Sequence, residues 1–412
     1  MTQTSSTKAI IERHDAFLAP NYLRYPIALV RGEGSRLWDA EGKEFIDLFA
    51  GFGAPLLGHC HPDLVAAVTD QAHKLWHAGA TFHTEPQTHL AEAISRHGFG
   101  GKSFFSHSGA DANEAAIKLA RLYGQGERYK IITAHNSFHG RSMATMMATG
   151  QQKVRGGYQP WLDGFAHVPY NDVDAMRDAV DDRTIAIMVE PIQGEGGANV
   201  PDDDYLPGLR ALCDEKGILL ICDEVWTGCG RTGRYFAHQH WGIEPDIMTL
   251  AKGVGGGLPV GVMCAKPSVA EYNNPSRYGG VAKHGTTLGA NCLSMAVSVR
   301  IFEVLERDGL VARAADAGEY VKARLREIGE RTGVISGVRG LGLFLGAELD
   351  PSAPNAWFSD GNEVVNRCLE RGLILNVVQE RILRVAPAVT VSNADIDEGL
   401  AILESVLAGK AA

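Results

Sequence analysis

Lys252 is the residue with the clearest chemical potential in this sequence. It follows the apolar run of residues 246–250 and precedes the glycine-rich segment GVGGGLPVG. An amine at the end of a buried strand loses hydration, which lowers its pKa and makes it a nucleophile. A lysine whose ammonium group reaches solvent would fit the same pattern, so Lys252 alone does not decide between the two interpretations.

A second group of residues suits an anionic ligand. Residues 108–110 (Ser-Gly-Ala) follow an apolar run and open a helical stretch, where free N–H groups and the helix dipole can hold a phosphate. A plain helix cap would use the same residue types. The segment HNSFHGR places Phe138, His139 and Arg141 in one loop. An aromatic ring beside a cation suits a flat anion, although such residues also occur in ordinary packing.

Carboxylates follow two further apolar runs. Glu190 and Glu195 lie in the turn-forming segment after IAIMV, and Asp223 follows ILLIC. Strand alternation places Asp223 and Val225 on one face and Glu224 on the other. An acid at the end of an apolar strand costs free energy unless a cation meets it.

These signals converge because ligands of open α/β sheets bind beyond the carboxyl ends of the strands. A phosphate cradle, an aromatic ring, an acid and a buried lysine at one sheet edge match pyridoxal 5′-phosphate. That cofactor needs a phosphate site, a lysine for its Schiff base, a carboxylate for its pyridinium nitrogen and apolar ring contacts.

The elements that must position these residues alternate along the middle of the chain. Apolar strands are predicted at residues 102–106, 130–134, 185–189, 218–222 and 246–250, with helices such as NEAAIKLARLYG and LPGLRALCDEKG between them. Strands that are apolar throughout and joined by helices indicate a parallel sheet covered on both faces. Residues 62–78 and 86–97 are predicted to be helical.

The two ends of the chain predict a second, smaller α+β domain. Short strands with glycine turns are expected between Ile27 and Asp47. Beyond Ser294, long helical stretches lead to a strand–helix–strand segment that ends in ILRVAPAVTV. The 412 residues are enough for two or three domains.

Composition excludes several classes of protein. The net charge is −10 and no Lys/Arg-rich run is present, so we expect no nucleic-acid partner. The longest apolar runs are too short to span a membrane, and the beginning of the sequence shows no secretory signal. The seven scattered cysteines, none in a C-x-x-C pair, indicate reduced thiols in a cytoplasmic protein. Histidine pairs at 59/61 and 73/77 lack an acidic cluster, so no metal is expected.

Ten segments follow one another between about residues 20 and 408. They are RGEGSRLWDAEGKEFIDL, LGHCHP, HSGADANEAAIKLAR, SFHGR, VEPIQGEGG, ICDEVWTGCGRTG, LAKGVGGGLPVG, HGTTLGANCLSMA, VRGLGLFLGAEL and LRVAPAVTVSNADIDEG. In this order they resemble the class III (ornithine-type) aminotransferases. The first and the last two are most similar to acetylornithine aminotransferases. The resemblance implies the type I pyridoxal-phosphate fold, with a large domain of mostly parallel sheet covered by helices and a smaller α+β domain. The predicted divisions are residues 1–60 joining the small domain, 61–300 as the cofactor domain, and 301–412.

The resemblance also implies roles at matching positions. Lys252 would form the Schiff base and Asp223 would pair with the pyridine nitrogen, while Phe138 and Val225 would enclose the ring. The residues matched to phosphate binding are Ser108, Gly109, Ala110 and, from the neighbouring subunit, Thr287. A homodimer with shared active sites is therefore implied.

On the substrate side, Arg141 would hold the α-carboxylate, and Tyr22 and Phe52 would line the pocket. Glu195 and Arg384 match a pair that lets one site accept two unlike substrates.

Glu190 matches a carboxylate close to the cofactor. One position departs from the family, because Trp226 stands where a glutamine usually meets the phenolic oxygen of the cofactor. An indole N–H can donate a hydrogen bond but cannot accept one.

The predicted reaction is transfer of the terminal amino group of N2-acetyl-L-ornithine, or a similar ω-amino donor, to 2-oxoglutarate. Ornithine, putrescine, lysine, succinyl-diaminopimelate and 4-aminobutyrate remain alternative donors. An aminomutase or racemase on the same fold would need no 2-oxoglutarate pocket, so the Glu195/Arg384 pair argues against it. A non-catalytic relic would not need both Lys252 and Asp223.

Overall fold

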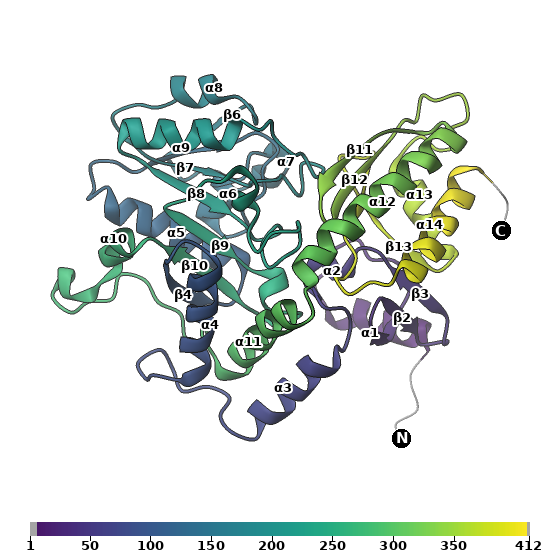
Figure 1. Cartoon of the computed structure of the whole chain (residues 1–412), viewed down its shortest axis with the longest axis horizontal. Helices are drawn as coiled ribbons and strands as arrows, with labels where there is room; N and C mark the ends of the chain where they lie inside the picture. Colours follow the sequence, from purple (N-terminus) through teal and green to yellow (C-terminus); the bar gives the residue numbers. More distant parts are fainter. Residues whose placement is uncertain (1–5, 410–412) are drawn as a thin grey trace.

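A seven-stranded sheet forms the centre of the larger part of the molecule (Figure 1). The computed structural model describes residues 6–409, and its strand order is β4-β10-β9-β8-β7-β5-β6. Every pairing in this sheet is parallel except those of β10, which runs antiparallel to β4 and β9. The strands are β4 (Lys102–Ser106), β5 (Lys130–Ala134), β6 (Phe165–Val168), β7 (Thr184–Val189), β8 (Leu219–Asp223), β9 (Ile247–Leu250) and β10 (Gly261–Ala265).

Helices cover both faces of this sheet, as the apolar strands predict. On β8, Leu219 and Ile221 pack in one apolar cluster with α5 (Gly109–Tyr123). Leu220 and Cys222, which point the other way, pack with α9 (Tyr205–Lys216). A mostly parallel sheet between two helical layers is therefore confirmed.

The remaining helices of the larger part complete the layers. Helix α11 (Cys292–Arg307) contacts both α3 (Pro62–Ala72) and α4 (Glu85–His97), and α4 also contacts β4. The short helices are α6 (Met143–Ala148), α7 (Gln152–Arg155), α8 (Val173–Asp178) and α10 (Pro267–Ala270). The 3₁₀ segments are η1 (Ala237–Trp241), η2 (Lys252–Val254), η3 (Glu271–Asn273) and η4 (Pro275–Tyr278). Across residues 6–409, no helix combines the length and apolar character that crossing a bilayer requires.

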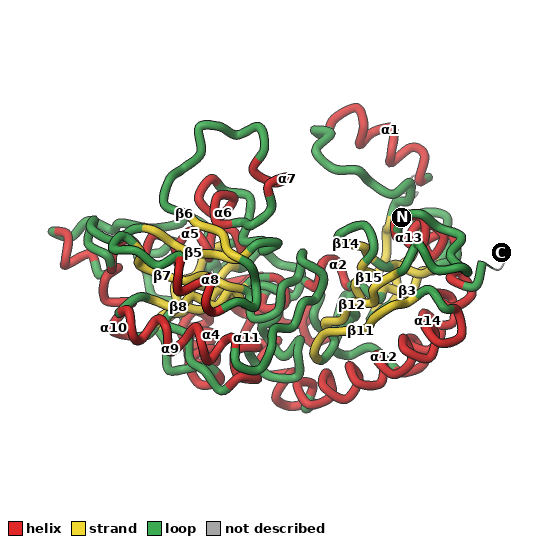
Figure 2. The backbone as a smooth tube through the Cα atoms, turned by 90° about the horizontal axis from the view of Figure 1, so that it is seen from above, coloured by secondary structure: helices red, strands yellow, loops and turns green. Residues whose placement is uncertain are grey.

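The smaller part is built on an antiparallel sheet in the order β11-β12-β15-β14. Helices α12 and α14 lie along one side of it (Figure 2). Its elements are α12 (Leu310–Thr332), β11 (Ile335–Leu341), β12 (Phe344–Leu349), α13 (Gly361–Glu370), β13 (Leu373–Ile374), β14 (Asn376–Val378), β15 (Ile382–Val385) and α14 (Asn393–Leu407).

The N-terminal strands join this smaller part. A second sheet has the order β1-β2-β3-β13, in which β3 pairs in parallel with the C-terminal strand β13. The N-terminal elements are α1 (Thr7–Phe17), β1 (Leu29–Glu33), β2 (Arg36–Asp39), β3 (Glu44–Asp47) and α2 (Ala50–Gly53).

Some element boundaries differ from the sequence predictions. The helix expected over residues 62–78 ends at Ala72, and the strand expected through residue 391 ends at Val385. Pro387 follows that strand closely and has no N–H to donate to a neighbour, which explains the early end. Strands β6 and β10 were not predicted individually.

Candidate active site

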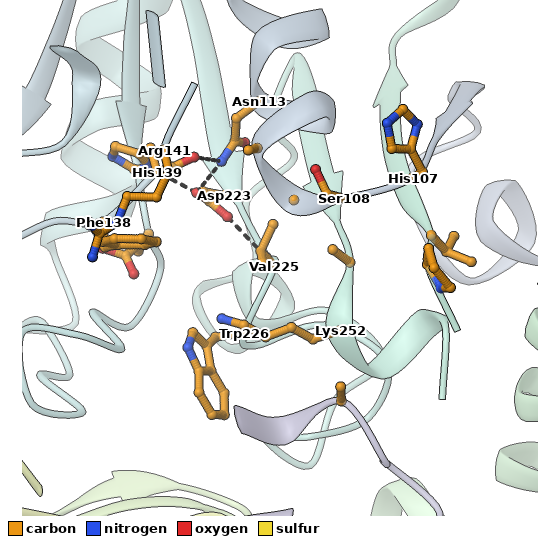
Figure 3. Close-up of a pocket in the computed structure, with 18 of the residues that line it drawn as sticks. His107, Ser108, Asn113, Phe138, His139, Arg141, Asp223, Val225, Trp226 and Lys252 are labelled. Carbon is orange, nitrogen blue, oxygen red and sulfur yellow. Dashed lines mark hydrogen bonds and ion pairs between the residues drawn. The ribbon is translucent and has the colours of Figure 1, made fainter. Parts of the chain in front are cut away.

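A cavity of about 420 Å³ opens where the strands of the large sheet end (Figure 3). It collects most of the residues that the sequence singled out. The predicted residues that line it are Ser108, Gly109, Ala110, Phe138, Arg141, Glu190, Asp223, Val225, Trp226 and Lys252. A pocket of this size with convergent polar groups is typical of a cofactor or substrate site.

The Asp223 carboxylate is held in place by three donors (Figure 3). Oδ2 accepts hydrogen bonds from Asn113 Nδ2 at 2.8 Å and His139 Nδ1 at 2.8 Å, and Oδ1 accepts from the Val225 N–H at 3.0 Å. The Asn113 amide also donates to the His139 carbonyl at 2.7 Å and accepts from Thr249 Oγ1 at 2.6 Å. The Asp223 side chain is 3 % exposed, and these hydrogen bonds fix its orientation.

Asn113 and Thr249 were missed by the sequence analysis. Asn113 lies one helical turn after Gly109, so its side chain faces the same side of α5, and that periodicity was the available signal. Thr249 gave no such signal, because its hydroxyl is one of many polar groups in apolar strands. Glu224 points to the other face, where its carboxylate accepts from the His238 backbone at 2.8 Å, as strand alternation predicts.

The beginning of α5 forms a narrow cradle. Ser108 caps the helix, because its Oγ accepts a hydrogen bond from the Asp111 N–H at 3.1 Å. A Cβ on Gly109 would lie 2.9 Å from Val225 Cγ1, and a Cβ on Gly261 would lie 2.1 Å from the Ser108 carbonyl oxygen. A side chain at either position would force its neighbours to shift, so the two glycines let Val225 and β10 lie close against the beginning of α5.

Lys252 begins the segment η2 with a left-handed backbone, φ 45°. Burial lowers the pKa of its amine to about 7, while the negative charge of Glu195 opposes the shift and Arg384 adds to it. Burial also raises the pKa of Glu190 to about 7, although the N–H groups of Phe138 and Gly194 donate to its carboxylate at 3.1 and 3.2 Å. Both groups therefore titrate near neutral pH, as residues of active sites often do.

Glu195 and Arg384 form an ion pair beside Lys252. Arg384 Nη1 lies 2.7 Å from Glu195 Oε1, and the arginine side chain is 1 % exposed against 27 % for the glutamate. Arg384 also donates to Asn376 Oδ1 from Nε at 2.9 Å and from Nη2 at 2.6 Å. Asn376 was not predicted, and it lies opposite Arg384 in the β14–β15 pairing.

Two predicted residues lie elsewhere in the described chain. Thr287 lines a separate hollow with His107, Asp111 and neighbouring residues. Tyr22 is 70 % exposed and lines a groove in the N-terminal segment. Phe52, which is 57 % exposed with a left-handed backbone, lies near the site, because its ring centroid is 5.0 Å from that of Phe49 and Phe49 packs 6.0 Å from Trp226.

Residues 17–407 match the family described as Aminotransferase class-III. The chain belongs to this family. Class-III aminotransferases transfer amino groups with pyridoxal phosphate as cofactor, so the central prediction from the sequence is confirmed.

This chain is similar to individual class-III aminotransferases along nearly its whole length. The acetylornithine aminotransferase of Caldanaerobacter subterraneus is 45 % identical over 95 % of this chain and 97 % of its own. The succinylornithine transaminase/acetylornithine aminotransferase of Pseudomonas aeruginosa is 40 % identical over 98 % of both chains. Among solved structures, the ornithine aminotransferase of Toxoplasma gondii has a TM-score of 0.91 at 30 % identity, covering 98 % of this chain and 96 % of its own. The N-acetylornithine aminotransferase of Stenotrophomonas maltophilia has a TM-score of 0.81 at 34 % identity, with 97 % and 98 % covered.

The cavity of this class-III aminotransferase fits pyridoxal phosphate. The first turn of α5 lies at the cavity wall, where helix N–H groups can hold a phosphate. Asp223 presents a fixed carboxylate, and burial lowers the pKa of the Lys252 amine to about 7. The donor set therefore matches the anionic phosphate, the basic ring nitrogen and the aldehyde of this cofactor.

Proposed function

We propose that this aminotransferase moves the terminal amino group of N2-acetyl-L-ornithine, or a similar ω-amino donor, to 2-oxoglutarate, with the semialdehyde and L-glutamate as products. The Glu195–Arg384 ion pair beside Lys252 is the observation that carries the proposal. A dicarboxylic acceptor needs a second cationic site, whereas a donor with a neutral acetylated arm needs that cation neutralised. The names of the similar curated enzymes support the same donor class.

Four groups of this chain would hold the cofactor. Lys252 would bond to it, Asp223 would pair with its ring nitrogen, and Phe138 and Val225 would lie on its two faces. Residues 108–110 would bind its phosphate at the beginning of α5. When bound, pyridoxal phosphate supplies a ring that accepts the electron pair left as a substrate C–H bond breaks.

Lys252 is the group that moves the proton. Burial lowers the pKa of its amine to about 7, so Nζ can both take up and release a proton near neutral pH. An amine poised in this way takes up the proton from the reacting substrate carbon and delivers it again without a strong thermodynamic bias. Glu190, whose pKa is also about 7, lies on the same cavity wall and would adjust the charge around the cofactor.

Arg141 would orient both substrates by their shared α-carboxylate. Its guanidinium lies 5.5 Å from the centre of the Phe138 ring at the exposed side of the cavity. While the donor is bound, Glu195 neutralises Arg384. When 2-oxoglutarate enters, the Glu195 side chain rotates away from Arg384. The distal carboxylate of 2-oxoglutarate then pairs with Arg384, and this bidentate contact offsets the lost ion pair.

A homodimer with shared sites completes this proposal. Thr287 lies outside the cavity of its own chain but in a hollow next to His107, which lines the cavity as well. The exposure of Tyr22 and Phe52 in one chain is consistent with sites that a second chain closes. We propose that Thr287 reaches the phosphate held by the partner.

The domain boundaries and the location of the enzyme remain proposals too. Pairing of β3 with β13 supports a small domain made from residues 1–60 and 301–412, whose first five and last three residues lie outside the described range. The seven cysteines, all free thiols in the structure, support a reducing compartment, the cytoplasm.

A donor panel with 2-oxoglutarate as acceptor tests the reaction. Purified protein should be yellow and should release glutamate fastest with acetylornithine, with ornithine, succinyl-diaminopimelate, putrescine, lysine and 4-aminobutyrate as the comparison set. Lys252→Ala should lose the yellow absorbance and nearly all turnover. Glutamate release from none of these donors, or unchanged absorbance in Lys252→Ala, would overturn the proposal.

A further inference from the structure

The indole of Trp226 lies against the Lys252 amine and the Arg384 guanidinium. Lys252 Nζ is 4.1 Å from the ring centroid, and Arg384 Cζ is 5.3 Å from it. Phe344 stacks on the indole at 5.0 Å with an interplanar angle of 22°. The ring is 7 % exposed, so its cation–π contact with Arg384 is made out of bulk water, where such a contact is strongest.

Two glycines make room for this side chain and fix its position. A Cβ on Gly53 would lie 2.3 Å from Trp226 Cζ3, at the six-membered ring. A Cβ on Gly194 would lie 2.8 Å from Cδ1 and 3.2 Å from Nε1. The N–H edge of the indole is therefore pressed against the backbone segment that carries Glu195, the residue after Gly194.

The indole N–H lacks a hydrogen-bond partner of good geometry among the described residues, although it is buried. It nevertheless acts on Glu195. Burial raises the pKa of Glu195, yet Arg384, Lys252 and the Trp226 N–H together hold that pKa below its ordinary value. A buried donor without a partner is costly, so this N–H is available to an oxygen that enters beside Arg384.

We propose that Trp226 is a specificity-determining residue for dicarboxylic acids. Its indole N–H has no partner in the described part of the chain while Glu195 pairs with Arg384, and it donates to the distal carboxylate of 2-oxoglutarate or glutamate once Glu195 has swung away and that carboxylate pairs with Arg384. The inference rests on the proposed function of the ion pair and assigns a residue to it at the position where the family usually carries glutamine.

The Arg384 guanidinium and the Trp226 indole N–H stay in place when the Glu195 side chain moves. Arg384 keeps its two hydrogen bonds to Asn376 and its place 4.9 Å from the centre of the Phe49 ring. The backbone of Glu195 is also held, because Gln379 Nε2 donates to its carbonyl at 3.1 Å. Only the glutamate side chain has to rotate, and the arginine and the indole then offer a preorganised pair of donors to the incoming carboxylate.

Calorimetric titration of the holoenzyme with two acids tests the inference. Glutarate has both carboxylates of 2-oxoglutarate, and pentanoate has only one. Trp226→Phe keeps an aromatic ring beside Phe344 but removes the N–H, so glutarate should bind about tenfold more weakly while pentanoate binding stays unchanged. Trp357→Phe is the matched control, since its Nε1 donates to the Val406 carbonyl at 2.8 Å in the smaller part of the molecule.

A measurement on the unaltered enzyme covers the case in which Trp226→Phe fails to fold. In holoenzyme with ¹⁵N-labelled tryptophan, glutarate should shift one of the six indole N–H signals downfield and pentanoate should shift none. If Trp226→Phe weakened the binding of glutarate and pentanoate equally, or if glutarate shifted none of the six indole N–H signals, the role of Trp226 would be overturned. If the unaltered enzyme itself showed no preference for glutarate, the proposed two-substrate site would fail instead.

Discussion

Replacing Glu195 with glutamine should separate the two halves of the reaction. The substitution keeps the size of the side chain and removes the charge that neutralises Arg384 at 2.7 Å. Arg384 would then present an uncompensated, almost fully buried cation to every molecule that enters the site. A donor could place its α-carboxylate there instead of at Arg141 and bind in an unproductive direction.

The structure bounds the size of this effect. Removing one partner of a fully buried ion pair costs about 3–5 kcal/mol. Glu195 is 27 % exposed, and Asn376 with the Phe49 and Trp226 rings still contacts the guanidinium, so about 1.5–3 kcal/mol is the better figure. Since about 1.4 kcal/mol corresponds to a tenfold change, the donor half-reaction should slow by about 10- to 100-fold.

The glutamate half-reaction should keep its rate or become faster, because the ion pair no longer has to open before the distal carboxylate binds. Stopped-flow absorbance of the bound cofactor measures each half-reaction separately. Glu348→Gln is a matched control, because Glu348 forms a 2.6 Å ion pair with Arg339 at a similar exposure, 24 %. Equal losses in the two half-reactions of Glu195→Gln would refute the exchange of partners and make Glu195 a structural carboxylate.

Three further predictions concern the rest of the site. Cofactor-free protein should regain its yellow absorbance faster as the pH rises from about 6 to about 8, because the Lys252 amine, with a pKa of about 7, loses its proton over that range. Asn113→Ala should destabilise the fold by about 2 kcal/mol in denaturant titration, because it leaves the buried carboxylate of Asp223 and the hydroxyl of Thr249 each short of a partner. Thr287→Ala should release the cofactor more readily on dialysis, and a mixed dimer of Thr287→Ala with Lys252→Ala chains should regain one intact site.

Each of these has a contrary result. A reconstitution rate that is flat over this pH range would mean that the Lys252 amine does not limit cofactor uptake. An unchanged midpoint and slope for Asn113→Ala would show that its hydrogen bonds to Asp223 contribute nothing to the fold. Mixed dimers without activity would place Thr287 at the cofactor of its own chain.

Local patterns in the sequence were sufficient to predict residues that line one cavity. Lys252, Asp223 and residues 108–110 each follow a run of apolar residues long enough to be a buried strand, and β9, β8 and β4 are those strands. Because parallel strands place their carboxyl ends at one edge, residues far apart in the sequence had to gather there. Alternation along one strand also separated Asp223 from Glu224 correctly.

Contacts between distant segments were decided only by the tertiary structure. Nothing local to Trp226 indicates that Gly53 and Gly194 leave space for its ring, or that the indole lies between Lys252 and Phe344. The antiparallel insertion of β10 was equally invisible. The N-terminal strands were expected to join the small domain, but the pairing of β3 with β13 was not predicted. Periodicity reports which face of an element is buried, whereas the partner on that face depends on how whole layers pack together. For this reason the sequence by itself determined which candidate residues gather at one cavity, and the packing of the two parts of the chain decided how closely their charges and rings meet.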